Sequence, residues 1–243
     1  MICAILVVKN GIFFAMDISV LNTGPFSINT WIVKICKNKV LVFDPAACKF
    51  TRDSGKIVDF LKENNLEPAA FLLTHGHFDH IAGTGICKSV YPDVPLAVHK
   101  NDLKMVGKNA SGAQASLLGS MGFEKFLPAL ENLPEPDVVF SGEPLLSSII
   151  KTSDSELEEA LSDWKIFHTP GHTEGSVCYY NEKEKTLITG DTIFYHSWGR
   201  TDFPGGSEPE MMKSLSRIYN SLPKDVMVFP GHDYAGFPLG ENF

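Results

Sequence analysis

The sequence lacks cysteines at the short spacing that thiolate metal sites and disulfide frameworks use. Its five cysteines are scattered over 243 residues, and their number is odd. This arrangement predicts neither a zinc–thiolate site nor a fold stapled by disulfides. A reducing compartment, the cytoplasm, is therefore the simplest expectation.

Basic residues and long apolar runs are also scarce. The chain has 21 Lys and Arg against 29 Asp and Glu, a net charge of −8. Surfaces that follow nucleic-acid phosphates are usually basic, so nucleic-acid binding is not expected. No apolar run reaches the roughly 20 residues that a membrane-spanning helix needs, so no membrane partner is expected.

The chain contains no internal repeat, low-complexity tract or linker, which favours a single domain. The apolar run Ile2–Val8 has no preceding positive charge and no clear cleavage site after it, so a secretory signal is not expected. Because a better strand-like segment opens at Met16, residues 1–15 are interpreted as an extension or an early start. The domain is then expected to span residues 16–243.

Strand-like segments occur in runs near both ends of the chain, and helical patterns lie between and after them. Strands are expected at 28–36, 39–44, 69–73, 95–99, 138–140, 144–150, 164–169, 176–180, 186–189 and 226–229. Helices are expected at 53–65, 101–106 with Asn101 as its cap, 152–162 and 208–222, and an irregular segment at 107–136. This order favours the α/β class with two packed sheets covered by helices.

The segment Thr74-His-Gly-His-Phe-Asp-His80 carries the strongest chemical signal. It follows an apolar strand, where α/β proteins often place ligand sites. Residues two apart in an extended chain face the same way, so His75 and His77 could reach one ion. A turn could send Asp79 and His80 to a second ion nearby. Imidazoles and carboxylates without thiolates suit zinc, iron or manganese.

Three further residues could complete such a pair of sites. Each is able to bind a metal, follows an apolar run and lies beside a glycine that lets the backbone turn closely. These residues are His172 in Thr-Pro-Gly-His-Thr, Asp191 in Thr-Gly-Asp-Thr and His232 in Pro-Gly-His-Asp. One such histidine alone would more often be structural, but the repeated arrangement around a strong first motif favours metal ligation.

Taken in order, these four motifs resemble the metallo-β-lactamase superfamily, from about Met16 onward. The resemblance implies an αββα sandwich with two divalent metal ions at one edge, zinc first and iron or manganese as alternatives. It implies that His75, His77 and His172 hold metal one, that Asp79, His80 and His232 hold metal two, and that Asp191 bridges both.

Two neighbouring stretches, 190–194 and 197–206, look like those of short glyoxalase II-like hydrolases, which act on hydroxyacyl-glutathione thioesters. The resemblance implies that a metal-bridging hydroxide cleaves a small-molecule thioester. Two ions would leave the site net positive, which favours an anionic substrate. The catalytic candidates are Asp79 and Asp191, with Asp79 also able to move a proton.

A second activity stays open at this point. The stretch Gly199-Arg-Thr-Asp-Phe203 and the ending Gly231-His-Asp-Tyr234 resemble persulfide dioxygenases, which use one iron. That resemblance implies iron on His75, His172 and Asp191, or on a closely similar triad. The continuation Pro204-Gly-Gly206 favours the hydrolase.

Some charged residues near the motifs are expected to support the site without taking part in the reaction. Asp44, at the end of a strand, is a candidate to hold a ligand from behind. Arg200 and Asp202 are expected to clamp their loop through an ion pair.

Overall fold

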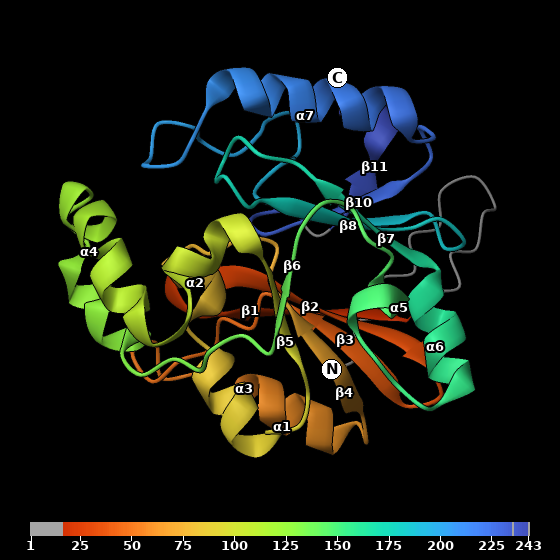
Figure 1. Ribbon diagram of the computed structural model, residues 1–243, viewed down its shortest axis with the longest axis horizontal. Coiled ribbons are helices and arrows are strands. Elements are labelled where there is room, and N and C mark those ends of the chain that lie inside the picture. The colour runs from red at the N-terminus through yellow and green to blue at the C-terminus, as the bar shows by residue number, and fades with distance from the viewer. Residues whose placement is uncertain (1–16, 235, 243) are drawn as a thin grey trace.

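The structure is a computed structural model that describes residues 17–234 and 236–242. Two sheets pack face to face with helices on both outer faces, which is the αββα sandwich expected from the sequence (Figure 1). The expected extension at residues 1–15 lies outside the described residues.

The six-stranded sheet has the order β1-β2-β3-β4-β5-β6 and the five-stranded sheet the order β11-β10-β9-β8-β7. The strands of the first are β1 (Ile18–Thr23), β2 (Ile28–Cys36), β3 (Lys39–Phe43), β4 (Glu67–Leu72), β5 (Leu96–His99) and β6 (Val138–Phe140). The strands of the second are β7 (Trp164–His168), β8 (Val177–Asn181), β9 (Thr186–Gly190), β10 (Met227–Pro230) and β11 (Phe237–Pro238). Strands β3 to β6 run parallel to one another, and β9 runs parallel to β10.

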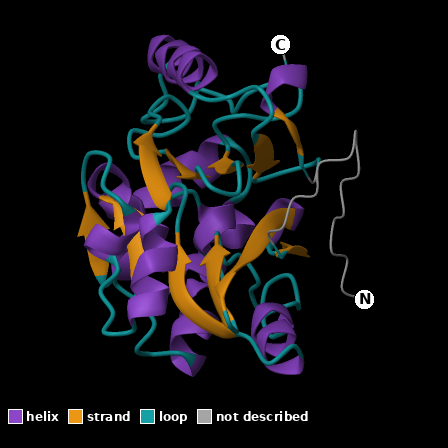
Figure 2. Cartoon of the chain, turned by 90° about the vertical axis from the view of Figure 1, so that its right-hand side faces the viewer, coloured by secondary structure: helices purple, strands orange, loops and turns teal. Residues whose placement is uncertain are grey.

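The helices pack on the outer faces and along the edges of the sandwich (Figure 1). They are α1 (Lys56–Glu63), α2 (Phe78–Ile81), α3 (Thr84–Val90), α4 (Ala110–Ser120), α5 (Leu146–Ile149), α6 (Ser155–Ser162) and α7 (Glu208–Ser221). Helix α7 lies over the five-stranded sheet, while α1 and α3 lie under the six-stranded sheet (Figure 1). The view turned by 90° shows the strands between helices above and below (Figure 2). No described helix is both long and apolar enough to cross a membrane.

Strand β3 shows how one strand serves two apolar layers. Leu41 and Phe43 belong to the core between the sheets, whereas Val40 and Val42 belong to the core under the helices. Successive side chains of a strand point to opposite faces, so a continuous apolar run is what a strand buried on both faces requires. The Phe43 ring lies 5.2 Å from that of Tyr179 on the other sheet, which joins the two sheets.

Helix α7 forms the third layer. Met211, Leu215 and Ile218 recur at helical spacing and pack in the core on the outer face of the five-stranded sheet. The Ser207 side chain accepts a hydrogen bond from the Glu210 backbone amide and so caps the helix. The amphipathic segment expected at 208–222 is therefore confirmed.

The strand expected at 144–150 is wrong, because Leu146–Ile149 forms the single helical turn α5. Leu146 and Ile150, four residues apart, both enter the core between the sheets. The Ile150 amide donates to the Leu146 carbonyl at 2.9 Å, a hydrogen bond between residues four apart that closes a helical turn and that a strand does not make.

The irregular segment expected at 107–136 contains the helix α4. Ala110, Gln114 and Leu118 recur every four residues and are buried, while both glycines of the helix are exposed. Tertiary packing of one face thus outweighs the low helix propensity of glycine.

The helix expected at 101–106 is a 3₁₀-helix over Lys100–Met105. Its cap is the His99 side chain, not Asn101 as expected, because His99 Nδ1 accepts the Asn101 amide at 3.4 Å. A histidine ring nitrogen at the N-cap position can accept this hydrogen bond in place of the oxygen of a Ser, Asp or Asn side chain.

We predict that His99 makes stability depend on pH. Burial, followed by the charges of His168 and Lys100, lowers the pKa of His99 to about 4. Unfolded histidine has a pKa near 6.5, so stability is lost as the pH falls from about 6.5 to about 4. His99→Phe should show a smaller fall in the free energy of unfolding over this range. Urea denaturation with a chelator present measures this, and parallel curves for the two proteins would contradict it.

Candidate metal centre

Seven histidine and aspartate side chains converge at one edge of the sandwich, where strands from both sheets end. Their ligand atoms form three overlapping groups, and within each group all lie within 4.8 Å of one another. The groups are His75–His77–His172, His75–His80–Asp191 and Asp79–His80–His232. All seven residues expected from the sequence are therefore brought together.

Each side chain reaches this edge from the end of a strand. His75 and His77 follow β4, and the single turn of α2 carries Asp79 and His80 back toward them. The other three come from the five-stranded sheet: His172 follows β7, Asp191 follows β9 and His232 follows β10. The site therefore exists only when the two sheets are packed together.

Asp191 lies in the middle of the cluster. Its Oδ1 is 3.3 Å from His80 Nε2, and its Oδ2 is 3.5 Å from His172 Nε2 and 3.4 Å from His232 Nε2. Burial raises the pKa of Asp191, but His232 and His80 outweigh burial and hold that pKa well below its usual range. Asp191 is thus an ionised carboxylate shared between imidazoles of different groups.

The donor atoms fit metal ions. His75 Nε2, His80 Nε2 and Asp191 Oδ1 are buried and have no hydrogen-bond partner among the described residues, and His77 Nδ1 lies 2.8 Å from His172 Nε2. An unsatisfied buried polar atom costs roughly 1–3 kcal/mol, so three such atoms in one ligand group indicate a binding site for an ion. Burial, reinforced by neighbouring imidazoles, lowers the pKa values of His75 and His77 well below the usual range. These rings are therefore neutral, the form that binds metal.

Asp44 holds the cluster from behind, as expected from the sequence. Its Oδ1 accepts the Thr74 amide at 2.8 Å, and its Oδ2 accepts Thr74 Oγ1 at 2.7 Å and His80 Nδ1 at 2.9 Å. These bonds orient the His80 ring so that Nε2 faces the other ligand atoms. Burial lowers the pKa of His80, but Asp191 and Asp44 outweigh burial and hold it well above its usual range. Metal binding would therefore release a proton from His80.

Asp102 is a supporting residue that the sequence did not reveal. Its carboxylate is fully buried and accepts the Gly76 amide at 2.8 Å, Thr173 Oγ1 at 2.7 Å and the Gly175 amide at 2.8 Å. It thereby joins the loop that carries His75 and His77 to the loop that carries His172. Asp102 lies far from every motif in the sequence, and only the fold reveals its position.

The β10 turn that carries His232 is attached to the other sheet. Trp31 Nε1 and Asn29 Nδ2 donate to the Pro230 carbonyl at 2.9 and 3.2 Å, and the Asn29 amide donates to the Gly231 carbonyl at 2.8 Å. Strand β2 therefore sets the position of His232.

The loop after β9 supports His172 from the other side. His172 Nδ1 donates to the Arg200 carbonyl at 2.7 Å, which leaves Nε2 facing the cluster. The expected Arg200–Asp202 ion pair is confirmed, with two hydrogen bonds of 2.7 and 2.6 Å. The guanidinium also lies 3.7 Å from the centre of the Phe203 ring.

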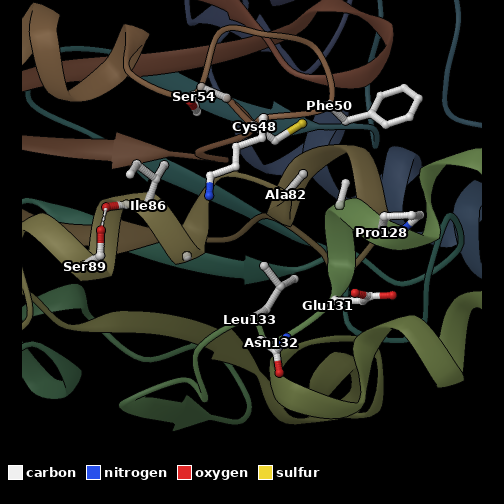
Figure 3. A pocket seen from close by; sticks show the side chains of 14 residues that line it. Cys48, Phe50, Ser54, Ala82, Ile86, Ser89, Pro128, Glu131, Asn132 and Leu133 are labelled. Carbon is white, nitrogen blue, oxygen red and sulfur yellow. Dashed lines mark hydrogen bonds between the residues drawn. The ribbon is translucent and has the colours of Figure 1, made fainter.

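The cluster opens into a cavity of about 560 Å³. Helix α4, the turn after it and the loop after β9 supply much of its wall. A larger cavity of about 680 Å³ lies between α3 and the segments around Cys48 and Pro128 (Figure 3). None of the residues in the three ligand groups lines it, so size alone does not mark the reactive site.

We predict that Asp44 controls metal affinity. Asp44→Asn preserves the shape of the side chain and its tolerance for the positive φ of 50°. The variant cannot accept from both Thr74 and His80 as a carboxylate does, so Zn²⁺ affinity should fall about 10- to 100-fold. Competition with a chromophoric chelator measures this. Asp154→Asn, which keeps an N-cap on α6, should bind Zn²⁺ like wild type.

We predict that Gly231→Ala damages the cluster without unfolding the chain. A Cβ at Gly231 would lie 2.5 Å from Asp191 Oδ1 and 2.7 Å from His80 Cε1. The side chains of Asp191 and His80 can move aside to make room for the Cβ. They then leave their positions in the cluster, so Zn²⁺ affinity should fall at least about 10-fold. Gly112→Ala is the control, because its Cβ meets nothing within 4 Å. Equal Zn²⁺ affinity in the two variants would disprove the assignment.

Comparisons with known proteins agree with this geometry. The family model described as Metallo-beta-lactamase superfamily matches residues 23–232. "Probable metallo-hydrolase YqgX" of Bacillus subtilis is 32% identical, over 86% of each chain. "Hydroxyacylglutathione hydrolase" of Bdellovibrio bacteriovorus is 31% identical over 81% of this chain, which spans 59% of that relative.

A solved structure of a metallo-beta-lactamase has a similar fold. The BLEG-1 B3 metallo-beta-lactamase superposes with a TM-score of 0.74 at 26% identity, over 92% of this chain and 95% of the other. The sandwich fold, the ligand cluster at its edge and the family match over most of the sequence all support the same assignment. This chain belongs to the metallo-beta-lactamase superfamily.

Proposed function

We propose that this member of the superfamily is a metal-dependent hydrolase that cleaves a small-molecule thioester, such as a hydroxyacyl-glutathione. The observation that carries the proposal is the pair of ligand triads on either side of Asp191, which offers places for two ions. The 31% identity to a hydroxyacylglutathione hydrolase supports the choice of a thioester.

In this proposal each triad holds one ion. His75, His77 and His172 would hold the first, Asp79, His80 and His232 would hold the second, and Asp191 would be shared between them. Zinc is the first choice, and iron or manganese are alternatives that the same nitrogen and oxygen donors accept. Bound ions would supply a water that ionises near neutral pH and positive charge beside the reacting carbonyl.

The residues of the chain orient the reactants. Asp79 lines the cavity, with Oδ2 3.6 Å from His232 Nε2, and is placed to hold a proton at the cavity floor. A thiol has a pKa near 8.5, so it can leave as a thiolate without much help from a general acid. This agrees with the cavity wall, which includes no lysine, tyrosine or cysteine among the described residues.

The second candidate is a persulfide dioxygenase with one iron on His75, His172 and Asp191. The stretch Gly199-Arg-Thr-Asp-Phe203 favours it. The triad Asp79–His80–His232 favours the hydrolase, because a single iron would leave this second group of ligands without a role. Metal content separates the two candidates: about two metals per chain with thioester hydrolysis supports the hydrolase. One iron with oxygen uptake on a persulfide would overturn it.

We predict that loss of a central ligand abolishes turnover. His77→Ala and Asp191→Ala should each lower kcat/KM for a thioester at least about 100-fold, the scale lost when charge stabilisation at the reaction centre is removed. His196→Ala is the matched control, because His196 is exposed and its Nδ1 donates to the Asn242 carbonyl at 2.9 Å. Activity like wild type in either ligand variant, with circular dichroism confirming the fold, would refute these roles.

A further inference from the structure

The wall of the reactive cavity is apolar above the ligand cluster. Besides Phe78 on α2, six of its lining side chains are hydrocarbon or thioether groups: Phe26, Leu117, Met121, Phe123, Phe194 and Phe203. They come from the loop before β2, from α4 and the turn after it, and from the loop after β9. Whatever projects from the reacting bond toward solvent therefore meets apolar surface.

Charged groups on this wall offer little to an anionic substrate. Apart from the histidines, Arg200 is the one cationic side chain among the described residues that line the cavity. Its guanidinium is already bound through two nitrogens to Asp202, and Asp233 adds a second carboxylate at the rim. A substrate carboxylate that formed an ion pair with Arg200 would leave Asp202 unpaired, so the net gain in binding free energy would be small.

The apolar wall is held in place before any ligand arrives. The Phe26 ring packs edge-on against Phe78, Phe123 and Phe126 at centroid distances of 5.6, 5.1 and 5.6 Å. Its backbone has a φ of 64°, which is uncommon for a bulky residue and sets it against this aromatic cluster. A packed wall of this kind lowers the ordering cost of binding an apolar group.

We propose that this site selects thioesters whose groups on either side of the reacting bond are uncharged and apolar, and that it disfavours thioesters carrying carboxylates. The proposal rests on the proposed thioester hydrolysis and narrows its substrate class: hydroxyacyl-glutathione, which carries carboxylates, is then disfavoured relative to neutral thioesters. It differs from the anionic substrate expected from the metal charges alone, because the wall, not the cluster, contacts the distant parts of the substrate.

The first test varies the substrate. N-acetylcysteamine is a neutral thiol carrier and glutathione a carboxylate-bearing one. With the same butanoyl group, kcat/KM should be at least about tenfold higher for the N-acetylcysteamine thioester than for the glutathione thioester. The glutathione carboxylates would lose hydration on binding without gaining an ion-pair or hydrogen-bond partner. On the neutral carrier, kcat/KM for butanoyl should exceed that for acetyl about 15-fold, because each of its two additional methylenes contributes about fourfold when buried. A higher kcat/KM for the glutathione thioester, or no dependence on chain length, would overturn the proposal.

The second test changes the wall. Met121 is half-buried, and Met121→Lys keeps the length of the side chain while adding a cation. The ratio of kcat/KM for glutathione over neutral thioester should rise about three- to fivefold, as a new ion pair permits. Met121→Leu should retain the wild-type ratio. Val139→Lys adds the same charge at an exposed site that does not line the cavity, and it should leave the ratio unchanged. An equal rise in Val139→Lys would contradict the assignment to the wall.

A binding measurement separates this proposal from the thioester reaction itself. Calorimetry with the metal-loaded protein and two unreactive thioethers, S-butyl-N-acetylcysteamine and S-butylglutathione, requires no turnover. The neutral thioether should bind more tightly, with a negative heat-capacity change that marks apolar burial. If thioesters are not cleaved but this binding is found, the proposed reaction fails and the apolar selection stands. If the glutathione thioether binds more tightly, the selection fails whatever the reaction.

Discussion

The carboxylate of Asp191, surrounded by His80, His172 and His232, is the interaction on which the arrangement of this molecule depends. His80 lies on α2, just after strand β4 of the six-stranded sheet, and the other two imidazoles follow strands of the five-stranded sheet. One buried anion thus connects both halves of the sandwich. Because a bound ligand stabilises only the folded chain, ions in this cluster would also add to the stability of the whole domain.

Supporting residues act at a distance from the reacting bond. Asp44 fixes the ring of His80, and Asp102 joins the loops that carry His75 and His172. Neither side chain is a ligand in the proposed scheme. Their hydrogen bonds limit how far the ligands can move, which is what tight binding of a metal requires.

Much of the fold and nearly all of the cluster could be predicted from the sequence, because local patterns carry them. The segment 74–80 places four candidate ligands within six residues, and strands such as β3 contain continuous apolar runs. What failed depends on contacts between distant residues. The helical turn at Leu146 buries Leu146 and Ile150 among side chains of both sheets, most of which lie far away in the sequence. Asp102 acquires its role from Gly76 and Thr173, which no spacing in the sequence connects to it.

Strand β2 grips the turn that carries His232 through the Pro230 and Gly231 carbonyls. Any movement of one sheet relative to the other would therefore also change the distances between the ligand side chains. A substitution in the core between the sheets, such as one at Trp31 or Phe229, would therefore change the geometry of the ligand cluster as well as the packing of the core. Natural variation in that buried layer can thus tune chemistry from a place no substrate ever touches.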